Sequence, residues 1–164
     1  KFDLYVITAG YLGNTLLARN DISEAIKILK ANYTSLVPWL CKICNDENLN
    51  NKSKMWVFSS VAADRGRPSN FHYGAAKSAL NTFCEGLILS TINKPFSIRL
   101  IKAGYIDTPM SYGKAPRILT VSPKYVVKTL LKKTDKNGIE YLPWWWFLIM
   151  RFVKILPKFL ISRM

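Results

Sequence analysis

Tyr73 and Lys77 stand four positions apart, a spacing that could support proton transfer. In a helix, residues four apart lie on the same face. A free phenol has a pKa of about 10, and a neighbouring ammonium group favours the phenolate, so Tyr73 could exchange a proton nearer neutral pH. The pair says little by itself, because a chain with eight tyrosines and 17 lysines holds about one such pair by chance.

Ser60 gives this pair a chemical context. It closes the apolar segment 54–60, which predicts a buried strand, and it precedes Tyr73 by thirteen residues. The intervening segment 64–70 contains a glycine and a proline and is predicted to be a loop, so the strand end and the helix start can converge. The Ser60 hydroxyl could then hydrogen-bond the carbonyl whose oxygen Tyr73 protonates.

The elements that must position these residues alternate along the chain. Short apolar runs predict buried strands, and helical spacing or capping residues predict helices between them. The expected strands are residues 4–8, 54–60, 96–101 and 138–142; the expected helices are residues 21–44, divided at Pro38, and 72–92, 122–133 and 144–156; the expected loops include residues 11–20, 45–53 and 103–116. This alternation predicts a doubly wound α/β fold, a parallel sheet that binds ligands at the carboxyl ends of its strands.

Three segments with distinctive residues follow one another along this pattern. They are Ser-Ser-Val-Ala-Ala at 59–63, Tyr-Gly-Ala-Ala-Lys-Ser-Ala-Leu at 73–80, and Ala-Gly-Tyr-Ile-Asp-Thr-Pro at 103–109. Together they resemble the catalytic serine segment, the Tyr-x-x-x-Lys helix and the Pro-Gly-x-x-x-Thr loop of the short-chain dehydrogenase/reductase family. Asn32 matches the helix asparagine of that family, and the resemblance covers nearly the whole chain.

The resemblance implies a Rossmann-like enzyme that uses NAD or NADP to move a hydride between nicotinamide and a carbonyl or alcohol substrate. It implies that Tyr73 is the general acid/base and that Lys77 lowers the pKa of Tyr73 and holds the nicotinamide ribose. It also implies that Ser60 orients the substrate carbonyl and that Asn32 positions a water in the proton relay. The further cofactor contacts that it implies are Ala9, Gly10, Gly104, Ile106 and Thr108.

The chain departs from the family pattern in three places. The family's Asn-Asn-Ala-Gly is Ile7-Thr8-Ala9-Gly10 here, its Pro-Gly is Ala103-Gly104, and none of the eight glycines forms a glycine-rich phosphate loop. The family's order of elements therefore implies that the first strands and the phosphate loop precede residue 1. We expect residues 1–142 to be a partial catalytic domain, residues 143–164 to be a separate tail, and the fragment alone to be inactive.

Charge and cysteine content limit the other classes of protein. Lys and Arg total 24 against 10 Asp and Glu, and the net charge of +14 permits nucleic acid or an anionic membrane surface as a partner. Three cysteines argue against a disulfide-stapled secreted scaffold, and the lone Cys-x-x-Cys at 41–44 is interpreted as helix packing. The chain shows no signal peptide, and its C-terminal apolar run 141–150 is too short for a spanning helix, which needs about 20 residues. These features predict a cytoplasmic protein.

The segment 144–160 is the strongest indication of a partner. If it is one helix, Arg151, Lys154 and Lys158 fall within an arc of roughly 60°, and the rest of the circumference is apolar and aromatic. This pattern is typical of a helix that lies in a membrane interface, here at the inner face of the membrane. Packing of the helix on a dimer partner or on the sheet is the alternative, and a homo-oligomer is expected.

The sequence leaves three functions open. The first is a reductase for a lipid-linked keto-sugar, because the tail and residues 9–13 also resemble, more weakly, the reductases of polyprenyl-phosphate-linked keto-pentoses. The second is a soluble reductase of acyl or steroid-like carbonyls whose tail is a dimer contact. The third is a basic nucleic-acid-binding module, which is disfavoured because the aromatic residues cluster in one apolar segment instead of alternating with basic ones.

Overall fold

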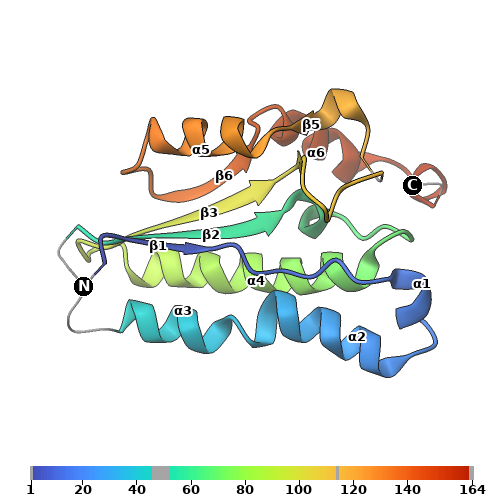
Figure 1. Ribbon diagram of the computed structural model, residues 1–164, viewed down its shortest axis with the longest axis horizontal. Helices are drawn as coiled ribbons and strands as arrows, with labels where there is room; N and C mark the ends of the chain where they lie inside the picture. Colours follow the sequence, from blue (N-terminus) through green and yellow to red (C-terminus); the bar gives the residue numbers. More distant parts are fainter. Residues whose placement is uncertain (1, 46–51, 114, 163–164) are drawn as a thin grey trace.

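The computed structural model describes residues 2–45, 52–113 and 115–162, and its main feature is a parallel sheet of four strands. The sheet has the strand order β1-β2-β3-β6 (Figure 1). These strands are β1 (Leu4–Ile7), β2 (Lys54–Ser60), β3 (Ser97–Ala103) and β6 (Gly138–Leu142). The predicted alternation and the doubly wound α/β fold are therefore confirmed, whereas residues 46–51 of the predicted loop 45–53 lie outside the described residues.

Helical segments connect the strands. They are α1 (Thr15–Ala18), α2 (Ile22–Leu29), the π-helical η1 (Lys30–Thr34), α3 (Val37–Cys44), the 3-10 turns η2 (Val61–Asp64) and η3 (Arg117–Leu119), α4 (Phe71–Ser90), α5 (Pro123–Leu131), α6 (Trp146–Ile155) and α7 (Lys158–Ile161). Side-chain caps begin α2 and α5, since the Asp21 side chain accepts from Ser23 N and the Ser122 side chain accepts from Tyr125 N.

Both faces of the sheet are covered, which explains the continuous apolar runs of its strands. On one face, Met55 and Val57 pack with Leu80 of α4 and Leu40 of α3; on the other face, Trp56 packs with α5. Figure 1 shows α5 on one side of the sheet and α4 with the α2–α3 pair on the other. Cys44 and Cys84 lie in the first of these cores, where burial raises the thiol pKa to about 11 and about 12. Cys44 of the Cys-x-x-Cys thus packs in the helix layer, as predicted.

The carboxyl ends of the strands define one edge of the molecule. Ser60 at the end of β2 is in register with Ala103 at the end of β3, and Ala103 is in register with Leu142 of β6. Because the strands are parallel, the segments after β1, β2 and β3 leave the sheet at this same edge. The Tyr73 end of α4 approaches this edge, because the chain enters α4 directly from the loop that follows β2.

The structure corrects several expected boundaries. Helix α1 forms within the predicted loop 11–20, and the predicted loop 103–116 contains β4 (Tyr105–Ile106), which pairs in parallel with β5 (Thr120–Val121). Position 114 of that loop lies outside the described residues. Pro38 lies in the first turn of α3, as its missing N–H permits, and the helix is interrupted upstream, at η1.

Helix α6 is buried along one stripe and exposed along the other. Trp146, Met150 and Val153 are buried against Val61 of η2, whereas Phe152 and Ile155 are 61% and 78% exposed. The expected single basic stripe does not extend to Lys158, because α6 ends at Ile155 and Lys158 begins the separate helix α7 after Pro157. No helix among the described residues is long and apolar enough to span a membrane.

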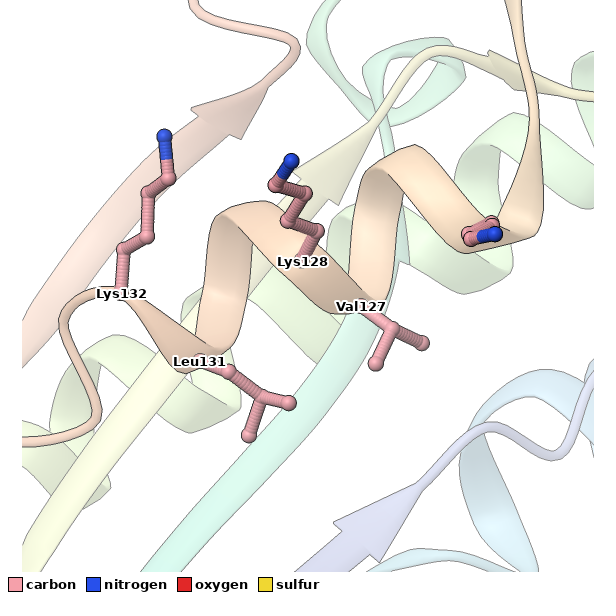
Figure 2. A pocket seen from close by; sticks show the side chains of 5 residues that line it. Val127, Lys128, Leu131 and Lys132 are labelled. Atoms are coloured by element: carbon pink, nitrogen blue, oxygen red, sulfur yellow. The ribbon is translucent and has the colours of Figure 1, made fainter.

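A shallow cavity of about 650 Å³ lies along the outer side of α5. Figure 2 shows Val127 and Leu131 projecting to one side of the helix and Lys128 and Lys132 to the other. Helix α5, which lines this cavity, is on the opposite side of the sheet from α4 (Figure 1), so the cavity is separate from the predicted catalytic residues.

Candidate active site

Tyr73 is buried in the first turn of α4, and a glycine allows that turn to pack closely. A Cβ at the next residue, Gly74, would lie 2.9 Å from the carbonyl oxygen of Ala62 in η2. Since η2 directly follows Ser60, the close approach of α4 brings Tyr73 to the end of β2. The structure therefore brings together Ser60, which the sequence placed at a strand end, and Tyr73, which it placed at a helix start.

Ser60 holds the turn and contacts the phenol. Its Oγ accepts from Ala62 N at 3.1 Å and caps η2. Burial raises the pKa of Tyr73 above its usual 10, and a hydrogen bond with the Ser60 side chain opposes this rise. Loss of water around the phenolate therefore decides the direction in this structure, and the lowering effect expected of Lys77 remains a prediction.

Lys77 lies on the same face of α4, one turn beyond Tyr73. Its ammonium nitrogen is 6.0 Å from the centre of the Tyr73 ring and donates to the Phe58 carbonyl at 3.0 Å. Only 3% of Lys77 is exposed, and burial lowers its pKa from 10.5 to about 8. At neutral pH Lys77 is therefore an ammonium group with further N–H donors available beyond the one used by Phe58.

Asn32 joins the helix layer to the loop after β1. It is fully buried in the π-helical turn η1, where Ser35 N donates to Lys30 O at 3.0 Å. Its side-chain oxygen accepts from Tyr11 N at 3.1 Å, and its side-chain nitrogen donates to the carbonyls of Tyr11 and Ile28 at 2.6 and 2.8 Å. These bonds show that the Asn32 side chain anchors the loop; its expected role with a water remains a prediction.

Gly10 completes this side of the site. A Cβ at Gly10 would lie 3.1 Å from the Asn32 side-chain oxygen and 3.5 Å from Lys77 Nζ. Gly10, Asn32 and Lys77, predicted separately from the sequence, therefore meet at one place. Ala9 precedes them and is exposed.

The loop after β3 is organised by a residue that the sequence reasoning missed. The Ser111 hydroxyl donates to the Ile106 carbonyl and accepts from Thr108 N at 3.3 Å. Among the described residues, the side-chain hydrogen bonds at Ile106 and Thr108 link them to each other and to Ser111, and none joins them to Tyr73 or Lys77. The Thr-Pro-Met-Ser spacing offers no signal for this contact, since it depends on the fold of the loop.

Gly104 has a packing role in this structure. A Cβ at Gly104 would lie 1.8 Å from the Trp146 indole nitrogen, so the glycine makes room for the largest buried ring of α6. The Trp146 ring also meets the Tyr105 ring edge to face, with centroids 5.6 Å apart. The turn after β3 and helix α6 are thereby fitted to each other.

A buried charge cluster lies behind the Ser60 turn. The Asp64 carboxylate, 2% exposed, pairs with Lys102 Nζ at 2.7 Å and accepts from the Tyr141 hydroxyl at 2.5 Å. Lys154 of α6 approaches the same carboxylate at 3.7 Å. Burial and the Asp64 carboxylate raise the pKa of Tyr141, which stays a neutral donor. Asp64 thus ties the turn after Ser60 to β3, β6 and α6.

The residues present fit one end of a nicotinamide dinucleotide. Gly10 lies beside a lysine with further N–H donors, which suit ribose hydroxyls, and Tyr73 lies one turn away from that lysine on the same helix. A glycine-rich loop that could hold a pyrophosphate is absent from the 164 residues. No group of three metal-ligating side chains occurs among the described residues.

Comparisons with known proteins agree with this arrangement. A family model described as short chain dehydrogenase matches residues 1–117. An uncharacterized oxidoreductase of Mycobacterium tuberculosis is 28% identical over 160 residues, which are 97% of this chain and 64% of that protein. A 3-oxoacyl-(acyl-carrier-protein) reductase of Chlamydia muridarum is 29% identical over 112 residues, 68% of this chain and 45% of that protein.

The fold is also similar to solved structures. A crystal structure of a short chain dehydrogenase from Burkholderia cenocepacia in complex with NADP has a TM-score of 0.74 at 18% identity, covering 94% of this chain and 66% of that one. This chain spans less than two thirds of the length of the Mycobacterium relative. Because the family model matches well over half of the residues and the expected motifs meet in the fold, the chain belongs to the short-chain dehydrogenase/reductase family.

Proposed function

We propose that this chain is the catalytic part of an NAD(P)-dependent oxidoreductase that acts on a carbonyl or alcohol substrate. The observation that carries the proposal is the buried Tyr73 hydroxyl, which meets Ser60 at the carboxyl edge of the sheet with Lys77 one turn away. A phenol and an ammonium group on one helix face, beside a serine hydroxyl, can deliver a proton to a carbonyl oxygen.

The residues would act in the direction of carbonyl reduction. A raised pKa keeps Tyr73 protonated at neutral pH, so the phenol is ready to donate its proton. The Ser60 hydroxyl would orient the carbonyl oxygen towards Tyr73, and Lys77 would stabilise the phenolate that remains. A nicotinamide dinucleotide, when bound, supplies the hydride.

The proposed enzyme needs an N-terminal part that carries the dinucleotide phosphates, as residues 1–142 lack the phosphate loop. The exposed Val127 and Leu131 on α5 support this proposal, because they offer an apolar surface on the outer side of α5 that a further part of the protein could cover (Figure 2). The relative's greater length agrees with it. The choice between NAD and NADP would be made in that part.

For the substrate we propose a lipid-linked carbonyl, such as a keto-sugar, reached from the cytoplasmic face of a membrane. The exposed aromatic and apolar residues of α6 and the basic C-terminal third support a peripheral contact through residues 144–160. Exposed Ile22, Ile26 and Trp39 on α2 and α3 support the expected homo-oligomer. A soluble acyl-carbonyl reductase is the second candidate, favoured by the similarity to the Chlamydia reductase.

The central test is the Tyr73→Phe variant of the intact protein, assayed by NAD(P)H oxidation with keto-sugar and 3-oxoacyl substrates. We expect the variant to lose about 10²–10⁴-fold in kcat, the contribution of a positioned general acid. Tyr125→Phe, on α5, is the matched control and should keep wild-type activity. Equal activity of the two variants would contradict the proposal, and the preferred carbonyl separates the two substrate classes.

A further inference from the structure

The loop after β1 is held by side chains that the family motif does not contain. Where the family has two asparagines, this chain has Ile7 and Thr8 before Ala9 and Gly10. The structure shows that the helix layer supplies the missing polar groups. Glu24 of α2 accepts from the Tyr11 hydroxyl at 3.0 Å and from Asn14 N at 2.9 Å, with the same carboxylate oxygen.

Glu24 and Asn32 hold the same residue of the loop from two sides. Asn32 binds both backbone polar groups of Tyr11, while Glu24 binds its side chain. Only 6% of Glu24 is exposed, and Lys27 Nζ lies 4.7 Å from the centre of the Tyr11 ring. Glu24 and Asn32 lie about two helical turns apart along the helix layer. Together they therefore fix both the side chain and the backbone of Tyr11.

A glycine in the loop makes room for this carboxylate. Gly13 has a φ of +66°, and a Cβ there would lie 2.9 Å from the Glu24 Oε1 and 2.4 Å from Ile28. The left-handed backbone turns the chain so that Asn14 N points to Glu24. A buried acceptor, its two donors and the glycine between them form one locally built unit.

The position of the loop sets the space beside Lys77. Gly10 precedes Tyr11, and the side on which a Cβ would stand faces the Asn32 side-chain oxygen at 3.1 Å and Lys77 Nζ at 3.5 Å. We propose that Glu24 is a positioning residue for the dinucleotide: by fixing residues 11–14, it keeps Gly10 where the cofactor ribose can approach Lys77. This inference rests on the proposed function. In this chain, contacts from α2 would take the place of the side-chain hydrogen bonds of the family's asparagines.

The proposal distinguishes a carboxylate that only stabilises the fold from one that shapes a binding loop. Alanine at position 24 leaves Asn14 N and the Tyr11 hydroxyl without their acceptor. Glutamine retains an amide oxygen that can accept both bonds. Glu85→Ala, an exposed position on α4, is the matched control.

The experiment measures steady-state kinetics and amide hydrogen exchange of the intact protein for Glu24→Ala, Glu24→Gln and Glu85→Ala. We expect Glu24→Ala to raise the KM for the dinucleotide about tenfold, with kcat and the KM for the carbonyl within about threefold of wild type. Glu24→Gln and Glu85→Ala should stay within about threefold in all parameters. Without cofactor, exchange in residues 11–14 should be faster in Glu24→Ala alone.

Other outcomes overturn the inference. An unchanged dinucleotide KM in Glu24→Ala, or an equal loss in both KM values and kcat, would leave Glu24 with a structural role only. Unchanged exchange in residues 11–14 would show that Glu24 does not hold the loop. If the wild-type protein oxidises neither NADH nor NADPH, the proposed function fails instead, and the exchange measurement still decides whether Glu24 holds the loop.

Discussion

Lys77 is an ammonium group enclosed by protein, and this determines its response to pH. Burial lowers its pKa from 10.5 to about 8. Between these values the unfolded chain binds more protons than the folded protein, so Lys77 makes the free energy of unfolding rise with pH. Burial raises the pKa of Tyr73 above 10 and that of Cys84 to about 12, so neither neighbour loses its proton over most of this range.

We therefore predict a pH-dependent difference between the wild type and Lys77→Met. The stability of the wild type relative to the variant should increase by about 1–3 kcal/mol from pH 8 to pH 10, since one pKa unit corresponds to about 1.4 kcal/mol. Urea unfolding at several pH values measures it. Lys42 is an exposed position on α3, and the plot of unfolding free energy against pH for Lys42→Met should run parallel to that of the wild type. A parallel plot for Lys77→Met would contradict the burial of the charge.

Single residues of the site differ in how visible they are in the sequence. Tyr73 and Lys77 could be paired from spacing alone, and Ser60 from its place at a strand end. Glu24 and Ser111 could not, because their importance lies in contacts with loops whose shape the sequence does not disclose. The direction of the Tyr73 pKa was also out of reach, since it depends on burial, which spacing cannot reveal.

At the scale of elements, the way in which α6 packs was the least visible in the sequence. Its buried stripe packs on the turn after Ser60, and Gly104 provides the space that Trp146 occupies. Asp64 adds a polar link, because its carboxylate reaches both β3 and α6. Helix α6 therefore packs against the turn that follows Ser60, and it cannot be removed without exposing Val61.

The packing of α6 can be tested with Gly104→Ala. A methyl group there would overlap the Trp146 indole, so the ring or β3 must move, and we expect a loss of about 1–3 kcal/mol in the free energy of unfolding. Gly66→Ala is the control, because no atom lies within 4 Å of a Cβ at that position. Urea unfolding of both variants makes the comparison; equal stabilities would show that Trp146 has room to adjust.

The order of strands and helices was predictable because apolar runs and caps are local signals. The β4–β5 pair was missed, since two-residue strands leave no periodic pattern, and η1 was missed because a π-helical turn has no composition of its own. Projection of 144–160 onto one helix gave the wrong position for Lys158 because Pro157 ends the regular spacing. Local propensity thus predicted which elements form, and tertiary packing determined where they depart from the regular pattern.

For the molecule as a whole, charge and exposed apolar surface coincide. Residues 114–164 contain 11 basic and two acidic residues, which is +9 of the net +14. The outer side of α6 carries Leu148, Phe152 and Ile155 beside Arg151. An anionic lipid surface would satisfy both features, because it attracts the charge and accepts the apolar side chains. Two copies of such a basic surface would repel each other.

The membrane proposal requires point variants on the outer face, since deletion of residues 143–164 would also remove the buried Trp146 and Met150. The intact protein should sediment with vesicles that contain phosphatidylglycerol and not with phosphatidylcholine vesicles. The double variant Phe152→Ser/Ile155→Ser should weaken this binding at least about tenfold, because each apolar side chain contributes about 1.5–3 kcal/mol when fully buried. Ile118→Ser, 89% exposed on η3, is the control. The membrane proposal fails if the wild type does not bind anionic vesicles, or if it binds them no better than the double variant does. Either result would indicate that the outer face of α6 contacts a protein partner, and it would favour the soluble carbonyl reductase.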